Sequence, residues 1–225
     1  MDSGGLDETL RVGLLLPSPA VSGNRSTDGF VETGAERRYR RVDPELEDRL
    51  LRPGAKAETS PDRASYLVYR EFLHFERPPG VTPELDELLR DSGVHRVYRQ
   101  LSSPEISKPH NQDIRGDLLL GAWWDVLAEG LEAFDDWYDH EHIPMLMAVP
   151  RWLRIRRFEL VRGPGPRYLA LHDIGAESSF DEPGHRAAGR TPWRGRATVW
   201  RRNFDVRLYR VSPARVDRAQ QSRER

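Results

Sequence analysis

The sequence predicts an α+β fold made of two tandem ferredoxin-like repeats, each with an antiparallel sheet. The second half of the chain reads as strand, helix, strand, strand, helix, strand, which is the order of the ferredoxin-like unit. Strand-like motifs also recur, because YLVYREF resembles YLALHDI and VYRQLSSP resembles LYRVSP. Tyr66 precedes Tyr168 by 102 residues and Tyr98 precedes Tyr209 by 111, which suits one duplicated unit with an insertion or deletion. Chance similarity between short strands is the alternative.

Hydrophobic periodicity places the elements of the second repeat, residues 117–212. The apolar run LLLGAWWDV has strand length, and the helical pattern after it ends before Pro144. Two strands of alternating parity flank a Gly-Pro turn, and Pro183 and Gly184 limit the next helix to a short, broken one. The expected elements are strands at 118–126, 151–162, 168–174 and 204–211, and helices at 128–142 and 178–189.

The first repeat, residues 10–104, matches this order incompletely. Only 16 positions separate Leu14 from Phe30, against 34 between Leu118 and Trp152, so the first helix and its loop are missing. The turn-rich segment SPAVSGNRSTDG stands in their place. The expected segments are strands near 10–17, 30–43, 66–72 and 97–100, a capped helix at 82–93, an inserted loop at 44–63, a linker at 105–116 and a disordered tail at 213–225.

Composition excludes several classes of protein. With 35 basic and 36 acidic residues the net charge is −1, which offers no field to attract nucleic acid or an anionic membrane. The absence of cysteine excludes a disulfide scaffold and a thiolate metal site. The start lacks the basic and apolar regions of a signal peptide, and the apolar run 12–16 is too short to span a bilayer. We therefore expect a soluble, cytoplasmic protein that has no nucleic-acid or membrane partner.

The densest candidate chemistry lies in the segment FDDWYDHEHIP. Leu131, Phe134, Tyr138 and His142 fall on one stripe of the predicted helix, so His142 ends its buried face. A histidine in that place, next to a tyrosine, can exchange protons near neutral pH. The alternative is that His142 only caps the last helical carbonyls and the aromatic residues are ordinary core. No metal site is expected, because adjacent His and Glu side chains on a helix diverge.

The runs WYDHEHIPMLMAVPRWLRIRRFELVRG and PRYLALHDI resemble the pattern of EthD-like proteins in the dimeric α/β-barrel superfamily. The likeness is strong over most of 116–212 and weak over 10–104. It implies that the two sheets pack face to face as a pseudo-dimeric α/β barrel within one chain. Relatives include cofactor-free monooxygenases, lactone isomerases, polyketide cyclases and some haem proteins, so the fold does not fix the reaction.

The resemblance also implies where a site would lie. It places His142 at the edge of a cavity between sheet and helix, with Tyr138 as its neighbour or a proton donor. Side chains alternate between the two faces of each of the two following strands. One of these faces is purely apolar and is expected to pack under the helices; it carries Leu153, Ile155, Leu169 and Leu171. The expected substrate-binding residues are Trp152, Arg156, Phe158, Tyr168 and His172. Simple barrel filling and ion pairing by these groups is the alternative.

The sequence departs from the family pattern where Arg151 replaces a glycine and where the first repeat lacks the histidine-bearing helix. The leading expectation is a small-molecule enzyme without an organic cofactor that acts on an aromatic or polyketide-like compound by acid/base chemistry: cyclisation, dehydration, isomerisation or oxygenation. A non-catalytic binder or degenerate paralogue is the second hypothesis, and a haem-binding oxidoreductase using His142, His172 or His185 is the third. The missing helix also predicts self-association through an uncovered sheet.

Overall fold

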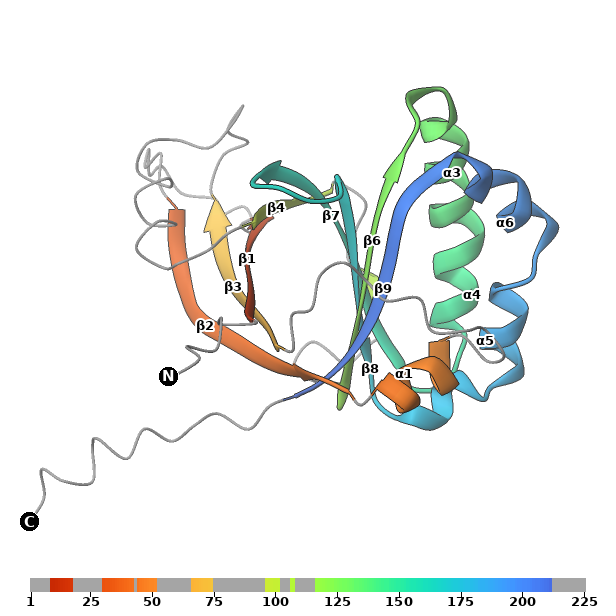
Figure 1. The fold of residues 1–225 in the computed structure, drawn as a ribbon, viewed down its shortest axis with the longest axis horizontal. Coiled ribbons are helices and arrows are strands. Elements are labelled where there is room, and N and C mark those ends of the chain that lie inside the picture. The colour runs from red at the N-terminus through yellow and green to blue at the C-terminus, as the bar shows by residue number, and fades with distance from the viewer. Residues whose placement is uncertain are drawn as a thin grey trace, which may run out of the picture.

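The computed structural model describes residues 9–17, 30–42, 44–51, 66–74, 96–101, 106–107 and 116–211. Nine strands form one sheet in the order β4-β1-β3-β2-β9-β6-β8-β7-β5, and β4 also pairs with β7. The first eight strands of that order therefore close into a barrel (Figure 1). The strands are β1 (Thr9–Pro17), β2 (Phe30–Arg41), β3 (Tyr66–His74), β4 (Arg96–Gln100), β5 (Ile106–Ser107), β6 (Leu118–Val126), β7 (Trp152–Arg162), β8 (Tyr168–Ile174) and β9 (Arg201–Val211).

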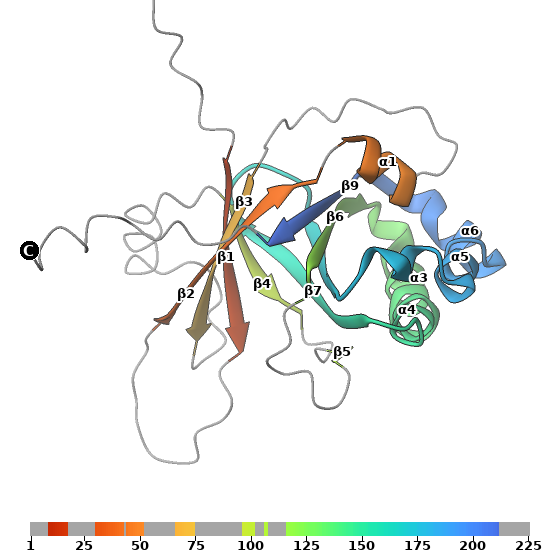
Figure 2. The ribbon, with the colours of Figure 1, turned by 90° about the horizontal axis from the view of Figure 1, so that it is seen from below.

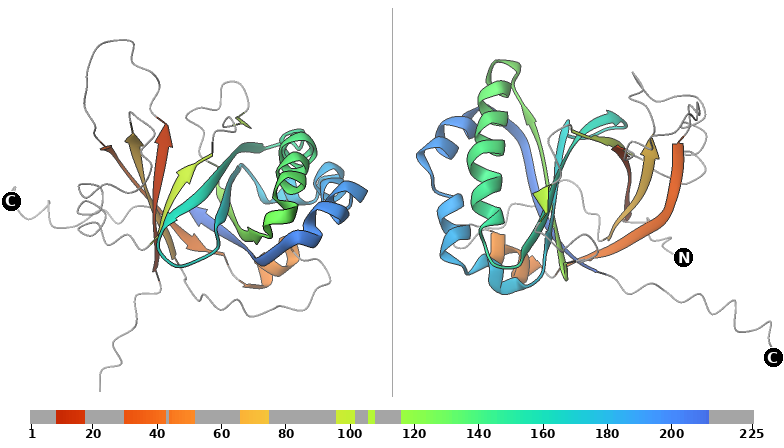
Figure 3. Two further views of the ribbon diagram at one scale, coloured as in Figure 1. Left: turned by 90° about the horizontal axis from the view of Figure 1, so that it is seen from above. Right: turned by 180° about the vertical axis from the view of Figure 1, so that it is seen from behind.

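Strands β6 to β9 form an antiparallel set in the order β9-β6-β8-β7. Helices cover one face of this set only, as the end views in Figure 2 and Figure 3 show. They are α3 (Leu131–Trp137), α4 (Ile143–Met147), α5 (Pro183–Ala188) and α6 (Pro192–Ala197). The expected strand and helix order of residues 117–212 is thus present, and β9 begins three residues before the predicted start.

The first four strands have the order β4-β1-β3-β2, but β1 runs parallel to both β3 and β4. The expectation of a fully antiparallel first sheet is therefore wrong. The two halves differ in the relative direction of their first two strands. Strands β6 and β7 are both antiparallel to β8, so they run the same way and need a crossover helix between them. Strand β2 is antiparallel to β3 while β1 is parallel to it, so β1 and β2 run in opposite directions and need no crossover.

The two halves join at both seams through antiparallel pairs. Tyr39 of β2 lies opposite Val211 of β9, and Val97 of β4 lies opposite Arg162 of β7. Aromatic and aliphatic side chains from both halves fill the interior, as is usual for an eight-stranded barrel. These interior residues are Tyr39, Leu67, Tyr69, Tyr98, Leu119, Trp123, Phe158, Leu169, Leu171 and Tyr209. The architecture is an α/β barrel within one chain, as the resemblance implies.

The helix that carries the predicted site is longer than expected and changes type along its length. It passes Pro144 and ends at Met147, with a π-helical turn at Tyr138–His142. In this turn the Ile143 N–H donates to the carbonyl of Tyr138, five residues back. A proline clashes with the carbonyl four residues before it in a regular α-helix, and the wider turn relieves that clash. The prediction that Pro144 ends the helix is therefore wrong.

Residues 44–51 form helix α1 (Pro44–Leu51), where the sequence predicted a loop. Acidic residues begin the helix and Arg49 lies near its end, which suits the helix dipole. Glu47 fixes α1 to the barrel, since one carboxylate oxygen accepts from the Leu208 N–H at 2.7 Å and the other from Arg41 at 2.6 Å. The buried Leu50 joins the core beneath the helices of the second half. The helix expected at 82–93, the linker apart from β5 and Gly116, and the tail lie outside the described residues. No helix in the described ranges is long and apolar enough to cross a membrane.

Candidate active site

A cavity of about 330 Å³ lies between the sheet of the second half and its helices. Its volume is within the range of small-molecule pockets. Aromatic side chains make up much of the wall, namely Trp124, Phe134, Trp137, Tyr138, Trp152 and Phe204. Three histidines and four arginines also line it, and the described lining residues include no carboxylate. Leu50 and Leu51 of α1 contribute to the wall, so the first half of the chain shapes this cavity.

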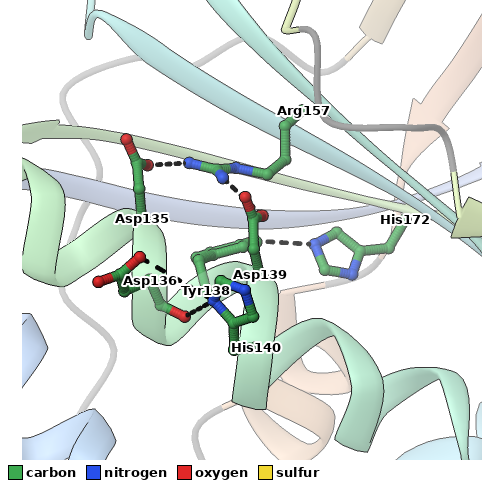
Figure 4. A network of polar contacts seen from close by, with 7 residues as sticks. All are labelled: Asp135, Asp136, Tyr138, Asp139, His140, Arg157 and His172. Atoms are coloured by element: carbon green, nitrogen blue, oxygen red, sulfur yellow. Dashed lines mark hydrogen bonds and ion pairs between the residues drawn. The ribbon is translucent and has the colours of Figure 1, made fainter.

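A buried hydrogen-bonded chain runs through His172 of β8. The indole N–H of Trp152 donates to His172 Nδ1 at 3.1 Å, so Nδ1 must carry the lone pair and Nε2 the proton. His172 Nε2 lies 3.5 Å from the Tyr138 hydroxyl (Figure 4). Burial lowers the pKa of His172 to about 3. The neutral imidazole therefore donates to the tyrosine oxygen, and the Tyr138 hydroxyl keeps its own proton for another acceptor.

His142 lies at the end of the π-helical turn, packed against two aromatic rings. Its ring stacks on Trp137 with centroids 4.7 Å apart and meets Tyr138 edge to face at 5.1 Å. The backbone of Ala188 favours protonation of this ring, and Nδ1 is buried without a hydrogen-bond partner. Burial, and then the charges of His172 and Arg194, lower the pKa of His142 to about 3. The imidazole is thus neutral, with an unused lone pair.

Arg157 of β7 holds the π-helical turn in place from the sheet side. Its guanidinium forms ion pairs with Asp135 and Asp139, the latter at 2.8 Å (Figure 4). The same group lies 4.7 Å from the centre of the Tyr138 ring, within cation–π range. Burial raises the pKa of Tyr138, so its hydroxyl stays protonated. By contrast, the His140 side chain is 71% exposed, and its Nδ1 lies 3.0 Å from the backbone carbonyl oxygen of Asp136.

Four of the seven residues expected at the site meet in the cavity: Tyr138, His142, Trp152 and His172. Tyr168 is buried on the same face, stacked on Trp124 at 6.2 Å, but does not line the cavity. Arg156 and Phe158 lie on the opposite face, within the barrel, so their expected place in the same pocket is wrong. Arg156 there donates to the Tyr69 hydroxyl at 3.3 Å.

A bulge in β7 explains why Trp152 lies on one face of the sheet and Arg156 and Phe158 on the other. The pairing between β7 and β8 shifts between Trp152 and Arg154, so that Trp152 and Ile155 both face the helices. Simple alternation places those two residues on opposite faces. Leu169 and Leu171, which we expected under the helices, point into the barrel instead. The bulge also brings Arg154 to Asp173, at 2.8 Å.

Sequence reasoning missed the arginines of the cavity. Arg194 of α6 and Arg201 of β9 line it, together with the more exposed Arg186 and Arg190. Residues 190–202, RTPWRGRATVWRR, contain five arginines and no acidic residue. That imbalance was the available signal, because most buried arginines need a nearby acid.

Within the described residues, no three His, Asp or Glu side chains are grouped in a way that could hold a metal ion. As an axial haem ligand His172 does not fit, because both of its ring nitrogens have partners. No established protein family matches the sequence, and no curated protein matches it.

Solved structures of similar shape include two proteins. One, described as a candidate monooxygenase from Lactobacillus acidophilus, aligns with a TM-score of 0.31 and 12% identity over 42% of this chain. The chain spans less than half of that structure, 45% of its length. The other, an anthrone oxidase-like protein, aligns with a TM-score of 0.41 and 10% identity, over 82% of this chain and 95% of that one. Similarity at this level carries no argument about the reaction.

Proposed function

We propose that this chain is an EthD-like small-molecule enzyme that enolises a planar aromatic or polyketide-like ketone in the cavity without an organic cofactor. The observation that carries the proposal is the meeting of two complementary groups on one aromatic wall. His142 is neutral with an unused lone pair, and Tyr138 is a protonated hydroxyl whose oxygen already accepts from His172. Enolisation needs one base and one hydrogen-bond donor placed in this way.

In the proposed reaction, the neutral imidazole of His142 removes a proton from the carbon next to a carbonyl group. The electrons of that C–H bond move into the new carbon–carbon double bond, and the carbonyl oxygen becomes an enolate. The Tyr138 hydroxyl donates to the enolate oxygen, and the aromatic wall limits access of water. Return of the proton to another carbon gives isomerisation, loss of a neighbouring hydroxyl as water gives dehydration, and attack on a second carbonyl gives cyclisation.

Deuterium exchange tests this proposal without knowledge of the natural substrate. The protein is incubated in D₂O with aryl ketones such as α-tetralone, and loss of the α-proton signal is followed by NMR. We expect catalysed exchange that falls by about 10²–10⁴-fold in H142A, the usual contribution of a general base. The matched control is H140A, which removes an exposed histidine from the same helical turn. No exchange with any ketone, or equal exchange in H142A, would refute the assignment.

A second variant separates the two proposed roles. Y138F removes the hydroxyl but keeps the ring that stacks on Trp124 at 5.3 Å and meets His142. Loss of one donor to a developing oxyanion typically lowers the rate about 10²–10³-fold. We expect that loss in the rate of exchange, with ketone affinity nearly unchanged. A variant that loses affinity alone would make Tyr138 a binding residue only.

A further inference from the structure

We propose that Arg194 and Arg201 form an anion subsite in this cavity, and that its ligand is a planar aromatic acid whose carboxylate pairs with the two guanidinium groups. The inference rests on the proposed function only for the place where the ligand binds, and it names the substrate class of that site. It depends on the geometry of two side chains that the acid/base mechanism does not use.

The first argument is that these two arginines lack a counter-charge. Among the described residues, neither guanidinium forms an ion pair or a side-chain hydrogen bond. Several other arginines that are at least partly buried have acidic partners. These pairs are Arg41–Glu47, Arg99–Glu159, Arg154–Asp173, Arg157–Asp135 and Arg207–Asp205. Within the described part of the chain, Arg194 and Arg201 therefore have no acidic partner at the cavity, and a bound anion would neutralise their charge.

The second argument is electrostatic. Both side chains are half-buried, and Arg201 lies over the Phe204 ring at 3.5 Å from its centre. Burial and the charge of Arg194 lower the pKa of Arg201 to about 10. Burial also lowers the pKa of Arg194. Two cations that share a sheltered wall, with no carboxylate among the described lining residues, produce a positive potential that favours an anion.

The third argument identifies the rest of the ligand. The remaining wall is largely aromatic, including Trp124, Trp137 and Trp152, so it suits a flat ring system better than a small hydrated anion. A carboxylate on such a ring can accept two parallel hydrogen bonds from a guanidinium group. An aromatic acid therefore satisfies the apolar wall and the two arginines together, whereas inorganic phosphate satisfies only the arginines.

The subsite would also act on His142. Charges on Arg194 and Arg201 both lower the pKa of this histidine, after the larger effect of burial. A carboxylate between the arginines and His142 would offset those charges and raise the pKa of His142. The anionic ligand would therefore strengthen the proposed base when it binds, and a neutral analogue of the same shape would not.

The test compares 2-naphthoate with its neutral isostere 2-naphthamide by isothermal titration calorimetry. We expect naphthoate to bind the wild-type protein at least about tenfold more tightly, as hydrogen bonds to charged groups allow, and to weaken as salt is added. The preference should disappear in R194M and R201M. It should persist in R196M, which removes an exposed arginine from the same helix. R201K keeps the charge and should keep part of the preference, which guards against loss of folding in R201M.

Three results would overturn the inference. They are equal binding of naphthoate and naphthamide, no binding of naphthoate at millimolar concentration, and inorganic phosphate that displaces naphthoate at equal concentration. An NMR titration gives an independent readout, since naphthoate but not naphthamide should raise the pKa of His142. The proposed function can fail separately: arginine-dependent binding of naphthoate without any ketone exchange would support the anion subsite and refute the enolisation.

Discussion

The buried imidazole of His172 makes the stability of this protein depend on pH. His172 is 2% exposed, and its pKa falls from 6.5 to about 3 on folding. Between these two values the unfolded chain binds a proton at this position that the folded protein does not. The free energy of unfolding therefore decreases as the pH is lowered, by about 1.4 kcal/mol per pH unit. At pH 5, which is about 1.5 units below the unfolded pKa, the loss from this residue is about 2 kcal/mol.

The substitution H172N isolates this contribution. Asparagine does not titrate, and its side-chain oxygen can accept from the Trp152 indole as His172 Nδ1 does at 3.1 Å. The variant loses the contact with Tyr138, so at pH 7.5 we expect it to be less stable by about 1–3 kcal/mol. That deficit should shrink by about 2 kcal/mol at pH 5, because only the wild type pays the penalty there. Burial, the largest cause of the lowered pKa of His142, is common to both proteins, whereas the smaller effect of His172 on that pKa is lost in the variant.

Urea unfolding followed by tryptophan fluorescence at pH 5.0, 5.8, 6.5 and 7.5 measures the difference. The exposed His140 provides the control, since H140N should run parallel to the wild type at all four values. If the curves of H172N and wild type also stay parallel from pH 7.5 to pH 5, His172 does not carry a lowered pKa. The buried hydrogen-bonded chain from Trp152 through His172 to Tyr138 would then be incorrect.

Two further predictions concern packing around the site. A Cβ atom added at Gly130 would lie 2.0 Å from Cγ of Trp200, so G130A should lose about 1–3 kcal/mol in chemical denaturation. G195A, which meets nothing within 4 Å, should be neutral or stabilised by up to about 1 kcal/mol, and equal effects of the two changes would contradict the packing described. Leu50 of α1 is 6% exposed and lines the cavity, so L50A should lose about 2–5 kcal/mol and bind 2-naphthoate more weakly. Unchanged stability and affinity would show that α1 does not dock there in solution.

The sequence determined most elements because their signals are local. The continuous apolar run of 118–126, the turn before Tyr168 and the helical stripe that includes Phe134 all depend on residues close along the chain. The same stripe placed Tyr138 and His142 on one helical face, and the structure brings both to the cavity. The short interval before Phe30 also predicts that no crossover helix joins the first two strands, and their opposite directions agree with that prediction.

Only the tertiary structure decided which side chains share a pocket. A one-residue bulge after Trp152 moved Arg156 and Phe158 to the barrel interior, and alternation read from the sequence does not reveal where a strand is irregular. Pairing across long distances was equally hidden. The reversed direction of β1 and the docking of α1 against the second half depend on hydrogen bonds between residues far apart, such as Glu47 with Leu208.

The two cavity arginines show the same contrast between what the sequence determines and what the tertiary structure decides. The sequence determined that residues 190–202 are rich in arginine and contain no acid, and it determined that the chain as a whole is nearly neutral. It could not determine which of these arginines would find carboxylates in other elements. Arg157 meets Asp135 and Asp139 across the sheet and helix, while Arg194 and Arg201 meet none among the described residues. Charge balance along a chain is a sum over residues, whereas the pairing of a buried charge depends on distances that only the folded structure sets.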